Sequence, residues 1–155
     1  MKVKKSFEQA ICIMLVLATC EGPVKSSELS QRLDVSDSYL KKITRQLVVA
    51  GLISSRSSKL GGFILNRNAK DITFLDIFDA IEGKDRFVET SRLVEKVFQV
   101  DLPIIDIEDY ILGHLNKAED KYRKTLGQIN LADILNAAHG NVNGVKNSML
   151  SIKDE

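Results

Sequence analysis

Two short amphipathic segments joined by a tight turn constrain the fold of this chain more than any other feature. In the first, residues 26–33, Leu29 and Leu33 are four positions apart and therefore share one face of a two-turn helix. Two turn residues later, Ser36 is a favourable N-cap for a second helix, which Gly51 would end. Two helices joined in this way are typical of a helix-turn-helix, which places its second helix in the major groove of DNA.

The second segment has one apolar face and one cationic face. Leu40, Ile43 and Leu47 have the spacing of a buried helical stripe, so the residues opposite them are predicted to face solvent. These residues are Ser38, Lys41, Lys42 and Arg45. Lysine and arginine contact phosphate, whereas Ser38 and Tyr39 lie at the start of the helix, where base edges would be nearest. The pattern therefore predicts a face that contacts DNA.

A hairpin with glycines near its turn follows the second helix. Residues 52–56 and 63–67 are expected to form two short strands on either side of Gly61-Gly62. Arg56 and Lys59 belong to the tip region and are placed to meet phosphate or a minor groove. A hairpin at this position is what a winged helix-turn-helix adds to the basic motif.

The net charge of +1 gives no information about nucleic acid, but the distribution of charge along the chain agrees with this prediction. Residues 24–70 contain nine lysines and arginines against three acidic residues, a net charge of +6. Residues 71–155 contain ten against sixteen, a net charge of −6. A basic module followed by an acidic half is expected when only one part of the chain meets phosphate.

Helices are expected on both sides of the basic module. Residues 6–20, with Ser6 as N-cap, are apolar almost all the way round and should form a mostly buried central helix. Thr73 is predicted to cap a further helix that runs to Gly83. Residues 1–83 should therefore form the winged helix-turn-helix domain of a chain that is mainly α with a small β wing.

Beyond a predicted connector at residues 84–102, one apolar stripe runs along residues 103–129. Its members recur every three or four positions: Ile104, Ile107, Ile111, Leu115, Ala118, Tyr122, Leu126 and Ile129. A helix of this length spans roughly 36 Å, which is more than one small domain covers, so we expect a long C-terminal dimerisation helix. A short closing helix at 131–138 completes the unit 103–138, and residues 139–155 are expected to be a flexible tail.

The two cysteines, Cys12 and Cys20, do not have the spacing of a metal site, and two cysteines are too few for a disulfide framework. On one helix they would lie about 12 Å apart, and we expect both to be buried there, in a reducing cytoplasm. The basic start of the chain and Leu17-Ala18-Thr19-Cys20 look like a lipoprotein signal. However, the apolar run is far shorter than the ~20 residues of a membrane span, and Glu8 precedes it. We predict a cytoplasmic protein with no membrane partner.

Five segments occur in the order and at the spacing of a known family. They are Gly22-Pro23-Val24, Val35 to Leu40, Ala50 to Ile53, Gly61 to Phe63 and Ile72 to Gly83. Together they resemble the Rrf-two (Rrf2) family of bacterial winged-helix transcription regulators. The resemblance implies a homodimer that binds a palindromic operator in double-stranded DNA as a repressor. It also implies DNA contacts from Ser36, Ser38, Tyr39, Lys41 and Lys42.

The chain departs from the family pattern in two places. Many relatives carry an arginine where this chain has Ser57, so contacts of the wing are expected to fall on Arg56 or Lys59. Relatives that bind an iron–sulfur cluster hold it with three cysteines ahead of the long helix, whereas residues 84–110 here contain none. Because such clusters are held by thiolates, we expect no iron–sulfur cluster or other cofactor.

Three questions stay open at this level. The same scaffold would also suit a protein-interaction module without specific DNA binding. An enzyme is not expected, because the chain shows no nucleophile elbow or phosphate loop, and His114 and His139 have no ligand partners at metal spacing. The signal would act through Cys12 or Cys20 as redox-sensitive thiols, or through a small-molecule effector or partner protein. Such an effector would bind between the first domain and the long helix, with residues 84–102 as the mobile part that couples binding to the spacing of the wings. The operator, the target genes and the choice between repression and activation are not encoded in any motif.

Overall fold

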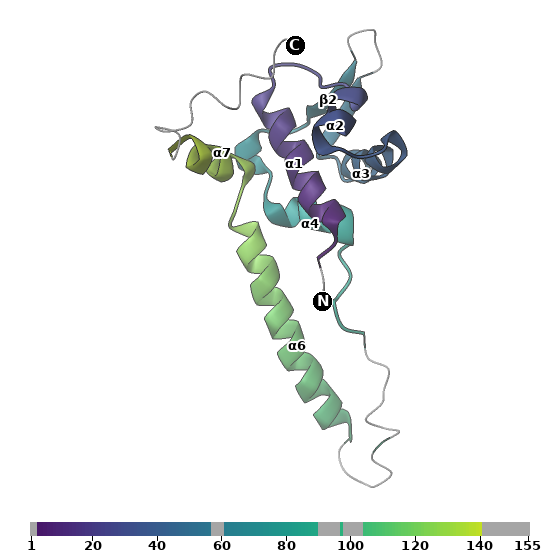
Figure 1. Cartoon of the computed structure of the whole chain (residues 1–155). Helices are drawn as coiled ribbons and strands as arrows, with labels where there is room; N and C mark the ends of the chain where they lie inside the picture. The colour runs from purple at the N-terminus through teal and green to yellow at the C-terminus, as the bar shows by residue number, and fades with distance from the viewer. Residues whose placement is uncertain (1–2, 57–60, 90–96, 98–103, 141–155) are drawn as a thin grey trace.

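The computed structural model describes residues 3–56, 61–89, 97 and 104–140 (Figure 1). It is mostly helical with one two-stranded antiparallel sheet, as predicted. The elements are α1 (Lys5–Thr19), α2 (Ser26–Leu33), α3 (Asp37–Val49), β1 (Ile53–Arg56), β2 (Gly62–Leu65), a 3₁₀ turn η1 (Ala69–Asp71), α4 (Phe74–Glu82), α6 (Ile104–Gly127) and α7 (Leu131–Gly140). Helix α6 projects away from the other elements, which gather at its C-terminal end (Figure 1).

Helix α1 is the central helix of the domain, as expected from its composition. Its buried residues are Phe7, Ala10, Ile13, Met14 and Leu17, and it packs against α2, α3, α4, α7 and β2. The predicted range of residues 6–20 was wrong by one residue at each end, because the helix begins at Lys5 and ends at Thr19. The N-cap is Lys4, two residues before the predicted Ser6. Lys4 precedes the helix and is held by the carboxylate of Glu82, with 2.6 Å between Nζ and Oε2.

The helix-turn-helix forms as the sequence predicts, apart from its first cap. The sequence predicts that Ser26 or Ser27 caps the first of the two helices. This was wrong, because α2 begins at Ser26 and its N-cap is Lys25, without a side-chain hydrogen bond. Asp34 makes the turn with a left-handed φ of 51°, a conformation that aspartate tolerates better than most residues. Ser36 caps α3 as predicted, with its hydroxyl accepting the N–H of Tyr39 at 3.3 Å.

The wing is a short hairpin attached to the start of α2. Its register pairs Ile53 with Leu65 and Arg56 with Gly62, so each strand deviates by one or two residues from its predicted limits. A second connection joins Phe63 to Val24 through two backbone hydrogen bonds of 3.0 and 2.8 Å. The wing tip, with Ser57 and Lys59, lies outside the described residues.

Helices α4 and α7 both pack against α1 and complete the hydrophobic core of the domain. Thr73 and Asp76 form the capping box at the start of α4, which confirms the predicted cap. Asn130 and Asp133 exchange hydrogen bonds of 3.0 and 3.1 Å at the start of α7. Helix α7 then extends to Gly140 rather than ending at residue 138. Through Leu131, α7 belongs to the same hydrophobic core as α1.

Helix α6 is covered by the domain only over its last turns. Tyr122 and Leu126 pack against the core, and Arg123 Nη2 donates to Asp79 Oδ1 at 2.6 Å. Further along the same stripe, Ile111 is 47% exposed and Leu115 is 42% exposed. The predicted apolar stripe is therefore present, but the described part of one subunit covers only its C-terminal end.

Candidate DNA-binding surface

A groove separates the start of α2, the start of α3 and the wing. Its volume is about 530 Å³, and its lining residues are Lys25, Ser26, Ser27, Asp37, Lys41, Ser55, Gly61, Gly62 and Phe63. Two lysines and three serines line it, against a single carboxylate. Such a lining offers ammonium and hydroxyl donors, which suits the oxygens of a phosphate backbone.

The cationic face of α3 is exposed as predicted. Leu40, Ile43 and Leu47 are buried, and this orientation leaves the face of Ser38, Lys41, Lys42 and Arg45 in solvent. Among the residues that the structure describes, the three cations make no ion pair, whereas Arg32 on α2 is paired with Glu28 at 2.7 Å. Unpaired cations on a rigid helix are available to neutralise phosphate without first breaking an internal contact.

The structure places the other predicted contact residues less uniformly. The Ser36 hydroxyl is already used as a cap and lies 3.2 Å from the hydroxyl of Ser38. Tyr39 is 36% exposed at the first turn of α3. Arg56 is exposed at the end of β1, and Lys59 lies outside the described part of the chain.

Sequence reasoning missed Lys25 and Ser55, which line the groove together with Lys41. Lys25 directly precedes α2, so its position after Pro23 and before two serines was an available signal. Ser55 carried no signal, because only the pairing of β1 with β2 brings it to the groove.

Gly62 fixes the position of the wing because the backbone of Val24 leaves no room for a side chain there. A Cβ atom at residue 62 would lie 2.4 Å from the carbonyl oxygen of Val24 and 2.6 Å from its carbonyl carbon. Both are backbone atoms, and the carbonyl oxygen also accepts the Phe63 N–H at 2.8 Å. The glycine therefore permits the contact that attaches the wing to the groove.

We expect Gly62→Ala to displace the wing and weaken DNA binding. The overlap should also lower the free energy of unfolding by about 1–3 kcal/mol, the usual cost of overpacking, as measured by urea denaturation. Gly22→Ala is the matched control, since a Cβ there meets nothing within 4 Å. If Gly62→Ala matches the wild type in stability and DNA affinity, the Val24 contact does not position the wing.

The two cysteines are less buried than predicted. Both were expected to be buried in the first helix, yet Cys12 is exposed and Cys20 is half-buried beyond the helix end. The prediction failed for Cys12 because α1 directs its fully buried face elsewhere. Partial desolvation, followed by the nearby carboxylate of Glu8, raises the pKa of the Cys12 thiol. Less thiolate is then present at neutral pH, which is the opposite of the usual tuning of a redox-sensing cysteine.

Two further observations concern other kinds of site. Among the described residues, no helix is long and apolar enough to cross a membrane. His114 Nδ1 donates a hydrogen bond to the carbonyl oxygen of Tyr110 at 2.9 Å, and the His114 ring packs on the Tyr110 ring. Within the same part of the chain, no three histidine, cysteine or acidic side chains gather as a metal site would require.

Comparison with protein families gives a match over nearly the whole chain. The model of the Rrf2 family, described as an iron-dependent transcriptional regulator, matches residues 3–137. The YffB protein of Lactococcus lactis, which is named as an HTH-type transcriptional regulator, is 34% identical over 145 residues, covering 92% of each chain. YwgB of Bacillus subtilis, named likewise, is 41% identical over 101 residues, covering 64% of this chain and 65% of its own.

Solved structures of similar fold lead to the same group of proteins. The structure of IscR from T. potens superposes with a TM-score of 0.64 at 27% identity, covering 92% of this chain and 91% of its own. CymR of B. subtilis, described as the global cysteine regulator, gives a TM-score of 0.63 at 26% identity, covering 86% and 95%.

Proposed function

This chain belongs to the Rrf2 family of transcriptional regulators, and we propose that it acts as a homodimeric repressor on a palindromic operator. Membership of this family supports DNA binding and a role in transcription regulation. The observation that carries the more specific proposal is the row of unpaired cations on the exposed face of α3, beside a groove lined by hydroxyl and ammonium groups. A helix with this face fits the major groove, and the wing then lies alongside.

We assign contacts with bases or with phosphates to each residue from its position on the surface. Ser38 and Tyr39, at the first turn of α3, contact base edges, while Lys41, Lys42 and Arg45 neutralise phosphates. Lys25 and Ser55 add phosphate contacts across the groove. Ser36 acts mainly by fixing the start of α3, because its hydroxyl is already engaged.

The proposed dimer forms through α6. Ile111 and Leu115 leave a large part of their surface in solvent on a helix that projects from the domain (Figure 1). A second copy packed by a two-fold axis would cover this stripe with the same stripe. Two copies of α3 would then be held at a fixed separation, which suits an operator with two half-sites.

The residues present do not fit a cysteine-ligated iron–sulfur cluster, although the family description mentions iron. The whole chain has two cysteines, both in the DNA-binding domain, and residues 84–110 contain none. Three or four thiolates are usual for such a cluster. We therefore propose that regulation here uses no cluster and depends on an effector of another kind.

The test is a selection of duplex DNA by the purified full-length protein, followed by footprinting of the recovered sequence. We expect protection of two half-sites one helical turn apart or a multiple of it. Recovery of no preferred sequence, with binding equally weak for all duplexes, would instead identify a winged-helix module that contacts protein.

A further inference from the structure

Asp37 is the one acidic residue among the described residues that line the groove between α2, α3 and the wing. It is the first residue of α3, and its side chain is exposed. Phosphate oxygens repel a carboxylate, so Asp37 gains nothing from the backbone of a bound duplex. The groove therefore contains a charged group that phosphate binding by the other lining residues does not explain.

The carboxylate of Asp37 is available to accept hydrogen bonds from a ligand. Its side chain makes no ion pair or hydrogen bond with any residue that the structure describes, although Lys41 lies one turn further along α3. The neighbouring hydroxyls of Ser36 and Ser38, by contrast, lie 3.2 Å apart, and the Ser36 hydroxyl also accepts the N–H of Tyr39. Of these three polar side chains at the start of α3, only that of Asp37 has no partner in the described part of the chain.

We propose that Asp37 determines operator specificity by accepting a hydrogen bond from the N4 amino group of a cytosine. The N-terminal residues of the second helix of a helix-turn-helix are those that contact base edges in the major groove. An ionised carboxylate only accepts hydrogen bonds, and cytosine presents an amino donor in this groove, whereas guanine and thymine present acceptors. Adenine also has an amino group, but its N7 acceptor lies beside it and would repel the carboxylate. This inference rests on the proposed function, because it assigns one base of the operator which that function requires.

Two lysines make this contact compatible with a surface that also meets phosphate. Lys25 and Lys41 line the same groove as Asp37, and their charges offset the repulsion between its carboxylate and the phosphates of a bound duplex. Asp37 therefore lowers the affinity for DNA in general, and this loss is recovered only where a cytosine amino group meets the carboxylate. Specificity is a difference between two affinities, and Asp37 acts on both of them.

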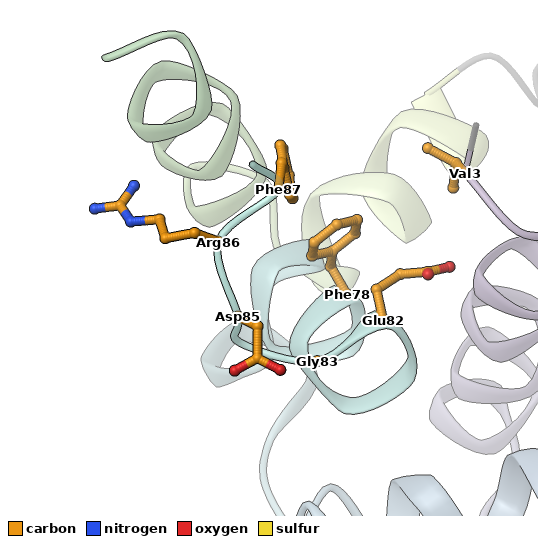
Figure 2. Close-up of a pocket in the computed structure, with 7 residues that line it drawn as sticks. All are labelled: Val3, Phe78, Glu82, Gly83, Asp85, Arg86 and Phe87. Carbon is orange, nitrogen blue, oxygen red and sulfur yellow. The ribbon is translucent and has the colours of Figure 1, made fainter. Parts of the chain in front are cut away.

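Asp85 offers a matched control, because it is another exposed carboxylate without an ion pair or hydrogen bond in the described part of the chain. It follows α4 and lines a separate cavity of about 210 Å³, which shares no lining residue with the groove. Its side chain points away from the rings of Phe78 and Phe87 (Figure 2). Asp85→Asn therefore removes the same charge as Asp37→Asn from a surface that takes no part in the proposed contact.

The test compares the full-length wild type, Asp37→Asn and Asp85→Asn on the operator that the wild type selects. Fluorescence anisotropy measures the affinity for this operator, for each of its single-base-pair variants and for a duplex of unrelated sequence. We expect the wild-type affinity to fall about tenfold or more when one particular cytosine of the half-site is replaced. In Asp37→Asn this loss should disappear at that position alone, and the affinity for the unrelated duplex should rise. Asp85→Asn should match the wild type on every duplex.

Two results with a defined operator would overturn the cytosine contact alone. In the first, Asp37→Asn keeps the wild-type loss at every position. In the second, it binds all duplexes more tightly by the same factor, so that Asp37 only places a negative charge at the start of α3, where it favours the helix. A wild type that selects no operator contradicts the proposed function, and the contact with it. Asp37→Asn is nearly isosteric and leaves the Ser36 cap in place, so α3 is retained in the variant.

Discussion

Replacing Ile111 and Leu115 together by glutamate should convert the protein into a monomer and weaken operator binding by ~100-fold or more. The two side chains form the exposed part of the α6 stripe, and four carboxylates would meet across a two-fold interface. A dimer binds its second half-site intramolecularly, and the effective concentration involved is worth ~10²–10⁴ in affinity. Light scattering measures the oligomeric state, and anisotropy measures the affinity for a two-half-site duplex.

Lys117→Glu is the matched control for this experiment. It changes the net charge by the same −2 on an exposed position of the same helix, away from the apolar stripe. We expect it to stay dimeric. If the Ile111→Glu, Leu115→Glu variant elutes as a dimer with unchanged operator affinity, the subunits associate through another surface.

Replacing Lys41, Lys42 and Arg45 together by alanine should remove most of the salt dependence of DNA binding. Each neutralised phosphate contributes ~0.9 to the slope of log affinity against log salt concentration, so three contacts contribute about 2.7 per subunit and about 5.4 per dimer. The affinity should fall for all sequences, because phosphate contacts carry no sequence information. Helix α3 should still form, since the buried stripe of Leu40, Ile43 and Leu47 is unchanged. Anisotropy titrations at several salt concentrations measure the slope.

The control removes the same charge from a different surface. Lys117, Lys121 and Lys124 are exposed on α6, and their replacement by alanine should lower the slope far less. A slope that is equal in both triple variants would show that α3 lies outside the interface, and that only net charge attracts the protein to DNA.

Substitution of Ser38 or Tyr39 should have a different signature. Their position at the first turn of α3 predicts altered sequence preference with little change in the salt slope. The contrast with the triple variant therefore separates recognition of bases from attraction to phosphate on one helix.

Local chemistry in the sequence determined the faces and ends of the elements that carry the candidate site. The three-and-four spacing of Leu40, Ile43 and Leu47 specified which face of α3 is buried, because the helical period is the same in every context. Ser36 and the Thr73–Asp76 box specified two helix starts, since a cap satisfies N–H groups only a few residues away. The caps of α1 and α2 failed where a serine was present but the extended backbone of a preceding lysine already began the helix.

Only the tertiary structure decided which elements cover which faces. Period and capping do not specify partners, so nothing local placed Ser55 beside Lys41, directed Cys12 to solvent or brought α7 back to the core through Leu131. The contact of Gly62 with Val24 joins residues that are far apart in the chain and depends on packing of the whole domain. The apolar stripe of residues 103–129 was visible in the sequence. That its C-terminal end packs on this domain while Ile111 and Leu115 stay uncovered depends on how the domain docks against α6.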